Sequence, residues 1–386
     1  MCTPTELALE VLAKAKRLDA KKLPPNSSDN DTLAAAQLLE LEALRTSLAD
    51  SCQRMRRLVL GPEEAMIDIL YSVRDHPSSK SLKPDHFSLQ FADILSIKAI
   101  YEYDIASHVP LNGTISYSDV AKASSLSESL CRCFLVHAME NDIFAEESGL
   151  VQHSDMSRRL ATDKDFLAAV GLVVSELAPA SHRVVEAIRK WPESVEPTET
   201  GFHIENNTDL PFYAFLAQNP QRMSRFSAAM QFFSRGGGLD LEHLLNGYPW
   251  HSIDYPSTVV VDVGGGQGTV SKAIAGWTRN IKFLVQDLAG PVKIGRDELP
   301  SNLIGRVKYV EADFFADQTV IGADVYFFRW ILHNWSDKHC IKILRSLVPA
   351  MKNHSKVIIY EYVLEDGPQQ KRRAKLQRWV ASSIDT

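Results

Sequence analysis

The chain has 386 residues, of which 45% are hydrophobic and 23% charged, values typical of a globular protein with more than one domain. Its net charge of -6 disfavours nucleic-acid binding, because such binding requires many basic side chains that neutralise phosphates. We therefore expect a small-molecule substrate and no nucleic-acid partner.

The sequence contains no apolar run that could serve as a signal peptide or cross a membrane. The longest apolar segment, residues 166–180, is short and is interrupted by Glu176. The cysteines are scattered in a way that fits neither paired disulfides nor a zinc site. They are Cys2, Cys52, Cys131, Cys133 and Cys340. We therefore predict a cytoplasmic protein with reduced thiols and no membrane partner.

Residues 1–84 are predicted to form an N-terminal helical segment. Apolar residues recur at three-and-four spacing over residues 6–18 and 32–60, and a polar stretch, residues 24–31, separates the two. The apolar stripe is suited either to packing on its own domain or to covering a second subunit. The protein is expected to be a homodimer.

Residues 85–165 have the outline of a winged helix. The pattern predicts a helix, a short strand at 114–117, helices at 118–124 and 128–141, and a turn at 147–149. Winged helices occur in DNA-binding proteins, but the helix in the recognition position carries one Arg and two Glu. A dimerisation domain is therefore the favoured interpretation.

Residues 166–250 are predicted to be a helical connector with an excess of aromatic residues. Most of these side chains should be ordinary core, and some could line a flat apolar pocket for the substrate. They are Phe202, Phe212, Tyr213, Phe215, Phe226, Phe232 and Phe233.

Residues 251–386 alternate short Val- and Ile-rich strands with helical stretches, which predicts a Rossmann-like α/β domain with a parallel sheet. Apolar runs such as VVVDV and KVIIYEY are typical of strands buried on both faces. The strands are expected at residues 258–263, 281–286, 306–310, 323–329 and 356–363.

The first of these strands runs into a glycine-rich turn, VVVDVGGGQG, followed by a helix. Gly264, Gly266 and Gly268 have G-x-G-x-G spacing, which does not satisfy the dinucleotide pattern G-x-G-x-x-G/A. Asp287 ends the next strand, where a carboxylate can accept hydrogen bonds from ribose hydroxyls. These features favour a nucleoside ligand and disfavour a nicotinamide oxidoreductase.

Five ordered motifs carry a family resemblance: DVGGGQG, LVQDLAGPV, EADFF, FFRWILHNWSD and KVIIYEYVLED. With them, residues 85–386 resemble the caffeic-acid-type O-methyltransferases, particularly the fungal branch that acts on secondary metabolites. The resemblance implies a class I methyltransferase sheet, S-adenosylmethionine (SAM) as cofactor, and a small phenolic, polyketide-like acceptor.

The resemblance also implies which residues surround SAM. From the methionine end of the cofactor to its adenine end they are Asp262, Gly264 and Gly266, then Asp287 at the ribose, then Asp313 and Phe314, with the basic residue Arg329 nearby.

His333 matches the catalytic base of the family, and Glu361 matches a carboxylate that orients it. A neutral imidazole can take the proton of a phenol as its oxygen attacks the methyl group, and a carboxylate behind the ring fixes the tautomer. The family is described as metal-independent, and the sequence has no HExxH motif.

Each of these residues could also have a purely structural role. Asp262 and Asp287 could cap helices or turns, and His333 could be a polar residue before a helix capped by Ser336. Glu361 could face solvent at the end of a strand.

The chain departs from the family after the last recognised strand. The family continues with a helix and two further strands, and supplies a second carboxylate beside the base, whereas this sequence ends at Thr386. The last recognised strand is then expected to be an uncovered apolar edge. The sequence is therefore incomplete, or another chain covers that edge, or activity has been lost. The alternative function is a non-catalytic, dimeric SAM-binding or interaction protein.

Overall fold

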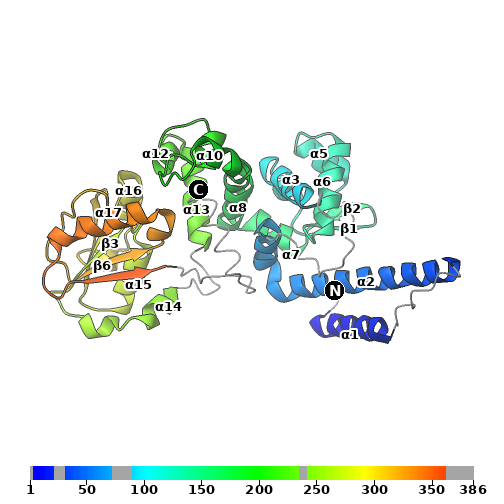
Figure 1. Ribbon diagram of the computed structural model, residues 1–386, viewed down its shortest axis with the longest axis horizontal. Helices are drawn as coiled ribbons and strands as arrows, with labels where there is room; N and C mark the ends of the chain where they lie inside the picture. Colours follow the sequence, from blue (N-terminus) through cyan, green and yellow to red (C-terminus); the bar gives the residue numbers. More distant parts are fainter. Residues whose placement is uncertain (1–2, 21–30, 72–88, 234–240, 362–386) are drawn as a thin grey trace. The chain divides into compact units, whose positions relative to one another are not determined.

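The structure is a computed structural model that describes residues 3–20, 31–71, 89–233 and 241–361 (Figure 1). The chain forms two compact units, Met1–Lys164 and Asp165–Thr386. The finer division into four domains stays a prediction. Among the described residues, every helix is too short or too polar to traverse a lipid bilayer.

The first unit is helical except for one hairpin. The helices expected at residues 6–18 and 32–60 are confirmed, and most of the polar stretch between them lies outside the described residues. The helices are α1 (Pro4–Ala20), α2 (Asp31–Tyr71), α3 (Leu89–Glu102), α4 (Ile105–His108), α5 (Tyr117–Ala123), α6 (Glu128–Glu140) and α7 (Asp155–Thr162). The turn expected at 147–149 joins the hairpin strands β1 (Ala145–Glu147) and β2 (Leu150–Gln152).

The strand expected at residues 114–117 is wrong, because only Ile115 pairs, through an isolated bridge to Val151 of β2. The next residue already begins a helix: the Oγ of Ser116 accepts the backbone N–H of Asp119 at 3.1 Å and caps α5. Because α5 begins directly after Ile115, the backbone there can form one β-bridge and no longer strand.

The second unit begins with helices and ends with a sheet. Its helical elements are α8 (Lys164–Leu172), the π-helix η2 (Val173–Leu177), α9 (Ala178–His182), α10 (Val184–Lys190), α11 (Gly201–Glu205), α12 (Phe212–Ala217), α13 (Pro220–Phe233), α14 (Leu241–Gly247), η3 (Trp250–Ile253), α15 (Thr269–Trp277), α16 (Ala289–Asp297), η4 (Ser301–Leu303), η5 (Leu332–Asn334), α17 (Asp337–Leu347) and η6 (Val348–Ala350).

The sheet has five parallel strands in the order β5-β4-β3-β6-β7. They lie within two residues of the predicted positions, apart from residues 362 and 363, which are outside the described part of the chain. The strands are β3 (Val259–Val263), β4 (Lys282–Asp287), β5 (Val307–Glu311), β6 (Val325–Arg329) and β7 (Lys356–Tyr360). In a parallel sheet the carboxyl ends of all strands meet at one edge, so residues 264, 287, 329 and 361 are brought together there.

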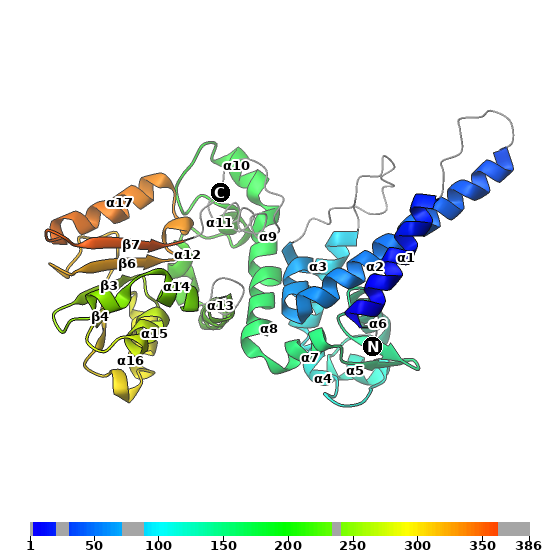
Figure 2. The same cartoon turned by 90° about the horizontal axis from the view of Figure 1, so that it is seen from below.

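Helices cover both faces of this sheet, as Figure 2 shows for α15 and α16 on one side and α17 on the other. Val260 of β3 and Phe327 of β6 pack towards α14, α15 and α16. Val261 and Phe328 point to the opposite face and pack with α17. Burial of the strands on both faces explains why their sequences are continuously apolar.

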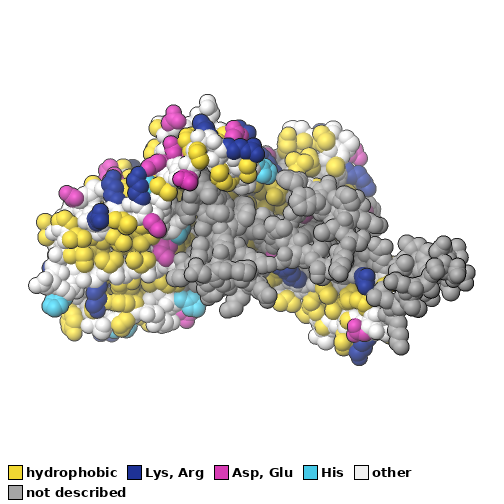
Figure 3. Space-filling view, in the orientation of Figure 1, with side chains coloured by type: hydrophobic (Ala, Val, Ile, Leu, Met, Phe, Trp, Pro, Cys, Tyr) yellow, Lys and Arg dark blue, Asp and Glu magenta, His cyan; other side chains and the backbone are white. Residues whose placement is uncertain are grey.

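β7 is the last strand of the sheet among those described. Ile358 and Tyr360 pack against the face covered by α15. Val357 and Ile359 point to the other face and are exposed. Apolar side chains also gather on the surface of this unit where α17 and β7 lie (Figure 3).

Candidate active site

The glycine turn connects β3 to α15 and has a backbone that favours glycine. Gly264, Gly266 and Gly268 have φ values of 70°, 58° and 75°, in the left-handed region. The N–H groups of Gly264 and Gly265 both donate to the carbonyl oxygen of Gln286, at 2.8 and 3.1 Å. The turn is therefore held against the end of β4.

The turn is tightly packed on its inner side and open at its tip. A Cβ atom at Gly264 would collide with the side chain of Ile331, and one at Gly265 would lie 2.5 Å from the carboxyl carbon of Asp262. At Gly266 a Cβ would meet no described atom within 4 Å. The free space next to Gly266 is where a ligand could approach the backbone.

Asp262 supports the turn from beneath. Its side chain is buried and accepts a hydrogen bond from Ser271 Oγ at 2.6 Å. Burial raises the pKa of this carboxyl to about 6, and the nearby charge of Asp287 adds to the rise, whereas the charge of Arg329 opposes it. Asp262 therefore shapes the turn by packing against Gly265 and α15.

Asp287, the last residue of β4, joins the turn to the strand end. Its Oδ2 accepts the N–H of Gly266 at 2.8 Å, and its Oδ1 accepts the N–H of Leu288 at 2.7 Å. Burial raises the pKa of this carboxyl as well, while the two backbone donors oppose the rise. A carboxylate oxygen can accept more than one hydrogen bond, so Asp287 retains capacity for a ribose hydroxyl.

Tyr309 of β5 is a supporting residue that the sequence analysis missed. Its hydroxyl donates to the backbone carbonyl of Gln267 at 2.9 Å, and burial raises the pKa of Tyr309 to about 12. Tyr309 fills the space next to Gly268 and Gly295, since a Cβ at either glycine would collide with its ring or hydroxyl. In the sequence, the packing of Tyr309 against the turn is indicated only by these two glycines.

The remaining predicted cofactor residues lie around the same edge of the sheet. A Cβ at Gly264 would be 3.6 Å from the ring of Phe314, so this ring borders the turn. The guanidinium of Arg329 stacks over the Trp330 ring at 4.0 Å. Its positive charge offsets part of the rise in the pKa of Asp262. Asp313 is exposed, and its Oδ1 accepts the N–H of Phe315 at 2.9 Å.

His333 and Glu361 form a direct pair, although they follow different strands. His333 lies in η5 after β6, and its Nδ1 contacts Oε2 of Glu361, which follows β7. The other oxygen, Oε1, accepts the backbone N–H groups of Ile331 at 2.6 Å and Leu332 at 2.9 Å. The carboxylate thus fixes both the imidazole and the backbone that carries it.

This geometry assigns the imidazole tautomer. An ionised carboxylate only accepts, so Nδ1 of His333 carries the hydrogen and Nε2 has the lone pair of a base. The Glu361 side chain is 10% exposed and that of His333 is 27% exposed, so Glu361 does not face solvent. Ser336, at the N-cap position of α17, makes no side-chain cap bond.

Ile331 links this pair to the glycine turn. Its side chain packs against Gly264, and its N–H donates to Glu361. The structure therefore places the predicted base and the predicted cofactor turn on either side of one residue. The backbone donors of Ile331 and Leu332 were not predicted, because backbone hydrogen bonds leave no pattern in the sequence.

Comparison with known proteins identifies the family. The O-methyltransferase domain family matches residues 205–384. A chlorophenol O-methyltransferase from Trichoderma longibrachiatum is 31% identical over 370 residues, which cover 94% of this chain and 77% of the relative. The chain belongs to the O-methyltransferase family. The O-methyltransferase pgmB from Aspergillus terreus strain NIH 2624 is 36% identical over 283 residues, or 72% of this chain and 79% of the relative.

This O-methyltransferase also shares its fold with a solved structure. OxaC in complex with SAH and oxaline matches with a TM-score of 0.68 and 18% identity, over 99% of this chain and 88% of that chain. The family indicated by the five sequence motifs and the predicted α/β fold with a helical N-terminal region are confirmed.

Proposed function

We propose that this O-methyltransferase transfers a methyl group from SAM to a phenolic hydroxyl of a small aromatic secondary metabolite, with His333 as the general base. The observation that carries the proposal is the His333–Glu361 pair, which Ile331 joins directly to the glycine turn. A base beside the predicted cofactor turn suits methyl transfer to oxygen, because it can take the proton of the acceptor hydroxyl as the oxygen attacks.

The residues around the glycine turn fit SAM as the methyl donor. The open tip at Gly266 allows close approach of a ligand, and Asp287 lies beside it at the strand end. Phe314 offers an apolar ring at the same edge, suited to an adenine. When bound, SAM supplies an electrophilic methyl group on a sulfonium. The family membership and the SAH held by OxaC support this assignment.

The role of His333 follows from the ordinary acidity of the acceptor. A phenol has a pKa of about 10 and is therefore largely protonated at neutral pH. Nε2 of His333, whose opposite nitrogen donates to Glu361, can accept that proton while the oxygen attacks. Glu361 then stabilises the imidazolium that forms, and its bonds to Ile331 and Leu332 keep it in place.

Two measurements test this function. Calorimetry should detect SAM binding to the purified protein, and mass spectrometry should detect methylated products from a panel of phenols and polyketide-like aromatics. His333→Ala should still bind SAM and should lose product formation by about 10²- to 10⁴-fold. Absence of SAM binding by folded protein, or full activity of His333→Ala, would refute the proposal.

The alternative, a non-catalytic SAM-binding protein, predicts cofactor binding without turnover on any phenol. The hydrogen bonds of Glu361 favour the enzyme, because they hold the imidazole of His333 with Nε2 available as a base.

Homodimer formation and a cytoplasmic location are also proposed. Leu9 and Leu12 of α1 and Leu58 and Val59 of α2 are exposed, which supports a role of the N-terminal helices in pairing two subunits. Light scattering on the wild type and on Val59→Glu tests the dimer. The described cysteines are free thiols, as expected in a reducing compartment.

A further inference from the structure

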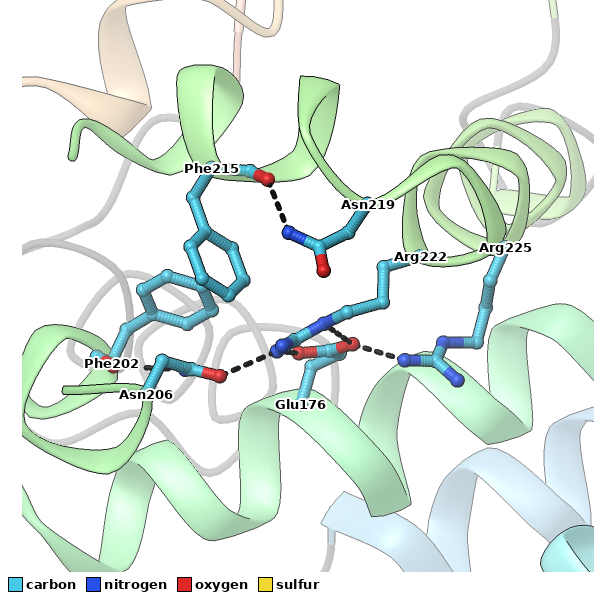
Figure 4. Close-up of polar contacts among 7 residues, drawn as sticks. All are labelled: Glu176, Phe202, Asn206, Phe215, Asn219, Arg222 and Arg225. Atoms are coloured by element: carbon cyan, nitrogen blue, oxygen red, sulfur yellow. Dashed lines mark hydrogen bonds and ion pairs between the residues drawn. The ribbon is translucent and has the colours of Figure 1, made fainter. Parts of the chain in front are cut away.

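Buried polar side chains link distant segments of the second unit. In its helical part, Oε1 of the buried Glu176 accepts the Nε of Arg222 at 2.7 Å and also contacts Arg225, so this cluster ties η2 to α13 (Figure 4). In the sheet, the buried side chain of Gln286 in β4 is linked to Gln318, in the connection between β5 and β6. The link made by Gln286 belongs to the predicted cofactor site.

The carboxamides of Gln286 and Gln318 bond to each other in both directions. Nε2 of Gln286 donates to Oε1 of Gln318 at 2.8 Å, and Nε2 of Gln318 donates to Oε1 of Gln286, also at 2.8 Å. Oε1 of Gln318 accepts the backbone N–H of Val320 as well, at 2.9 Å. Because hydrogen bonds are directional, two of them between the same two groups fix both the distance and the orientation of residue 318 relative to β4.

The backbone at the carboxyl end of β4 holds the glycine turn at the same time. The carbonyl oxygen of Gln286 accepts the N–H groups of Gly264 and Gly265. The carbonyl oxygen of the next residue, Asp287, accepts the N–H of Ala312 at 3.0 Å. The end of β4 is therefore bonded to the turn on one side and to the start of the β5–β6 connection on the other.

Phe314 lies between the two points at which this connection is bonded to β4. Its ring borders the glycine turn, and its carbonyl oxygen accepts the hydroxyl of Ser346 in α17 at 3.1 Å. The carbonyl oxygen of Ser346 accepts the N–H of Gln318, also at 3.1 Å. Residues 312–318 thus form a short loop that is held by β4 at both ends and by α17 in its middle.

Stability of the fold does not account for a buried amide pair. Burial of two carboxamides costs free energy that their mutual hydrogen bonds largely offset, and an apolar pair of the same volume would fill the space as well. An apolar pair would not impose one orientation, whereas a hydrogen-bonded pair does. A ligand that contacts both the glycine turn and the loop of residues 312–318 requires this fixed geometry, since its contacts depend on the spacing of the two.

We propose that Gln286 and Gln318 are positioning residues for the cofactor: their amide pair sets the distance between the glycine turn and the loop of residues 312–318, and a nucleoside that contacts both binds tightly only at that distance. The inference rests on the proposed function and specifies how the SAM site is held together. Neither side chain takes part in the chemistry. Changes to them should therefore alter the affinity for SAM and leave the reaction of bound SAM largely unaltered.

The first test replaces each glutamine by methionine, which has a similar volume and no amide. Calorimetry should show SAM and SAH binding about tenfold more weakly, or worse, to Gln286→Met and Gln318→Met than to the wild type. The KM for SAM should rise in proportion, whereas kcat at saturating SAM and the KM of a phenolic acceptor should change much less. Gln221→Met is the matched control, because Gln221 is exposed on α13, and it should bind SAM like the wild type.

The double variant Gln286→Met/Gln318→Met tests whether the two residues act as a pair. Each single substitution leaves one carboxamide without its partner, and the double substitution removes both. The double variant should therefore bind SAM no more weakly than the weaker single variant. Independent roles predict instead that the two losses multiply, to about a hundredfold, and this result would overturn the proposal.

Gln286→Glu gives a readout that a general loss of stability would not. A protonated carboxyl can donate to Oε1 of Gln318 while it accepts from Nε2, whereas a carboxylate only accepts and repels Oε1. The ratio of the SAM Kd of this variant to that of the wild type should therefore rise between pH 4.5 and 9, through the pKa of the introduced carboxyl, which burial raises. Asp262 and Asp287 are present in both proteins, so their titration cancels in the ratio. A ratio that does not change over this range would contradict the proposal.

A purely structural role predicts a different set of results. The methionine variants would then unfold at lower urea concentrations and, while folded, bind SAM as tightly as the wild type, which overturns the proposal. Gln318 is only half-buried, so Gln318→Met provides the test if Gln286→Met does not fold. Calorimetry does not depend on turnover. Weakened SAM binding in variants of a wild type without turnover refutes methyl transfer alone, and turnover with unchanged SAM affinity in the variants refutes the positioning role alone.

Discussion

Glu361 accepts the Nδ1 hydrogen of His333 with one oxygen, and with the other it accepts the N–H groups of Ile331 and Leu332. The carboxylate is therefore saturated with donors and cannot rotate without breaking several hydrogen bonds. This arrangement fixes which imidazole nitrogen can act as a base, and it makes a sharp prediction for an isosteric substitution.

Glu361→Gln should inactivate the protein by reversing the tautomer of His333. The two backbone donors will hold the amide oxygen, which turns the NH₂ group towards Nδ1 and forces the hydrogen onto Nε2. A ring protonated at Nε2 cannot accept the phenol proton, and a comparable loss in a serine protease is about 10⁴-fold. We expect kcat to fall by roughly 10³-fold or more, with the SAM affinity measured by calorimetry within threefold of wild type.

The control for this substitution is Glu311→Gln, at the exposed end of β5, which should keep wild-type turnover. Nitrogen NMR of labelled histidine reports the tautomer directly. Retention of the Nδ1–H form in folded Glu361→Gln, or unimpaired turnover, contradicts the assignment of roles.

Gly264→Ala should weaken SAM binding more than tenfold. An alanine at a φ of 70° costs about 1 kcal/mol or more, and its Cβ would also collide with Ile331, which carries the link to Glu361. Gly276→Ala is the matched control, because Gly276 lies in α15 and a Cβ there would meet no described atom within 4 Å. The control should bind SAM normally and be as stable as wild type or slightly more so. Equal SAM affinity in Gly264→Ala and Gly276→Ala would contradict a role of Gly264 in cofactor binding.

Asp262→Asn should remove a pH dependence of stability. Burial raises the pKa of Asp262 from 3.8 to about 6, so the folded state favours the protonated carboxyl. The wild type is therefore fully stabilised below about pH 4 and loses stability as the pH rises to about 6. The loss is at most about 3 kcal/mol, because each pKa unit is worth about 1.4 kcal/mol.

Urea unfolding of both proteins between pH 4.5 and 7.5 measures this effect. Asparagine can still accept the hydrogen bond from Ser271, and its stability should change less over the range than that of the wild type. The free energy of unfolding of the variant, relative to that of the wild type, should therefore increase as the pH rises. A constant difference would show that Asp262 does not titrate there.

Tyr309→Phe should loosen the glycine turn without touching the ligand. The substitution removes the hydrogen bond to the carbonyl of Gln267 and keeps the ring that packs against Gly295. We expect a loss of about 1 kcal/mol in the free energy of unfolding, measured with urea, and a SAM affinity reduced a few-fold. Tyr255→Phe, at an exposed position, serves as the control. Identical unfolding curves for wild type and Tyr309→Phe would rule out this support.

The sequence located the strands well, because burial on both faces requires continuous apolar runs such as residues 259–263 and 325–329. It could not give the order of the strands, which depends on pairing between distant segments. The predicted strand at 114–117 failed for a local reason, since Ser116 begins a helix one residue after the bridge at Ile115.

For the site, residue types and motif order indicated His333 and Glu361, and the fold explains why they meet: their strands, β6 and β7, are neighbours. The cluster at Glu176 could not be predicted, although its signal was present. A glutamate within the apolar run of residues 166–180 must be paired if it is buried, but nothing in the sequence indicates that the partners are Arg222 and Arg225.

Trp330, between Arg329 and the η5 turn that bears His333, has a φ of 57°, a conformation that is unfavourable for a bulky residue. A library of substitutions at Trp330 should therefore yield different residues when it is selected for folded protein and when it is selected for activity. Glycine or asparagine would be enriched when survival depends on yield of folded protein, and tryptophan when survival depends on product formed. Selection for heat resistance alone would therefore favour replacement of Trp330, whose strained backbone leads into the turn that bears His333.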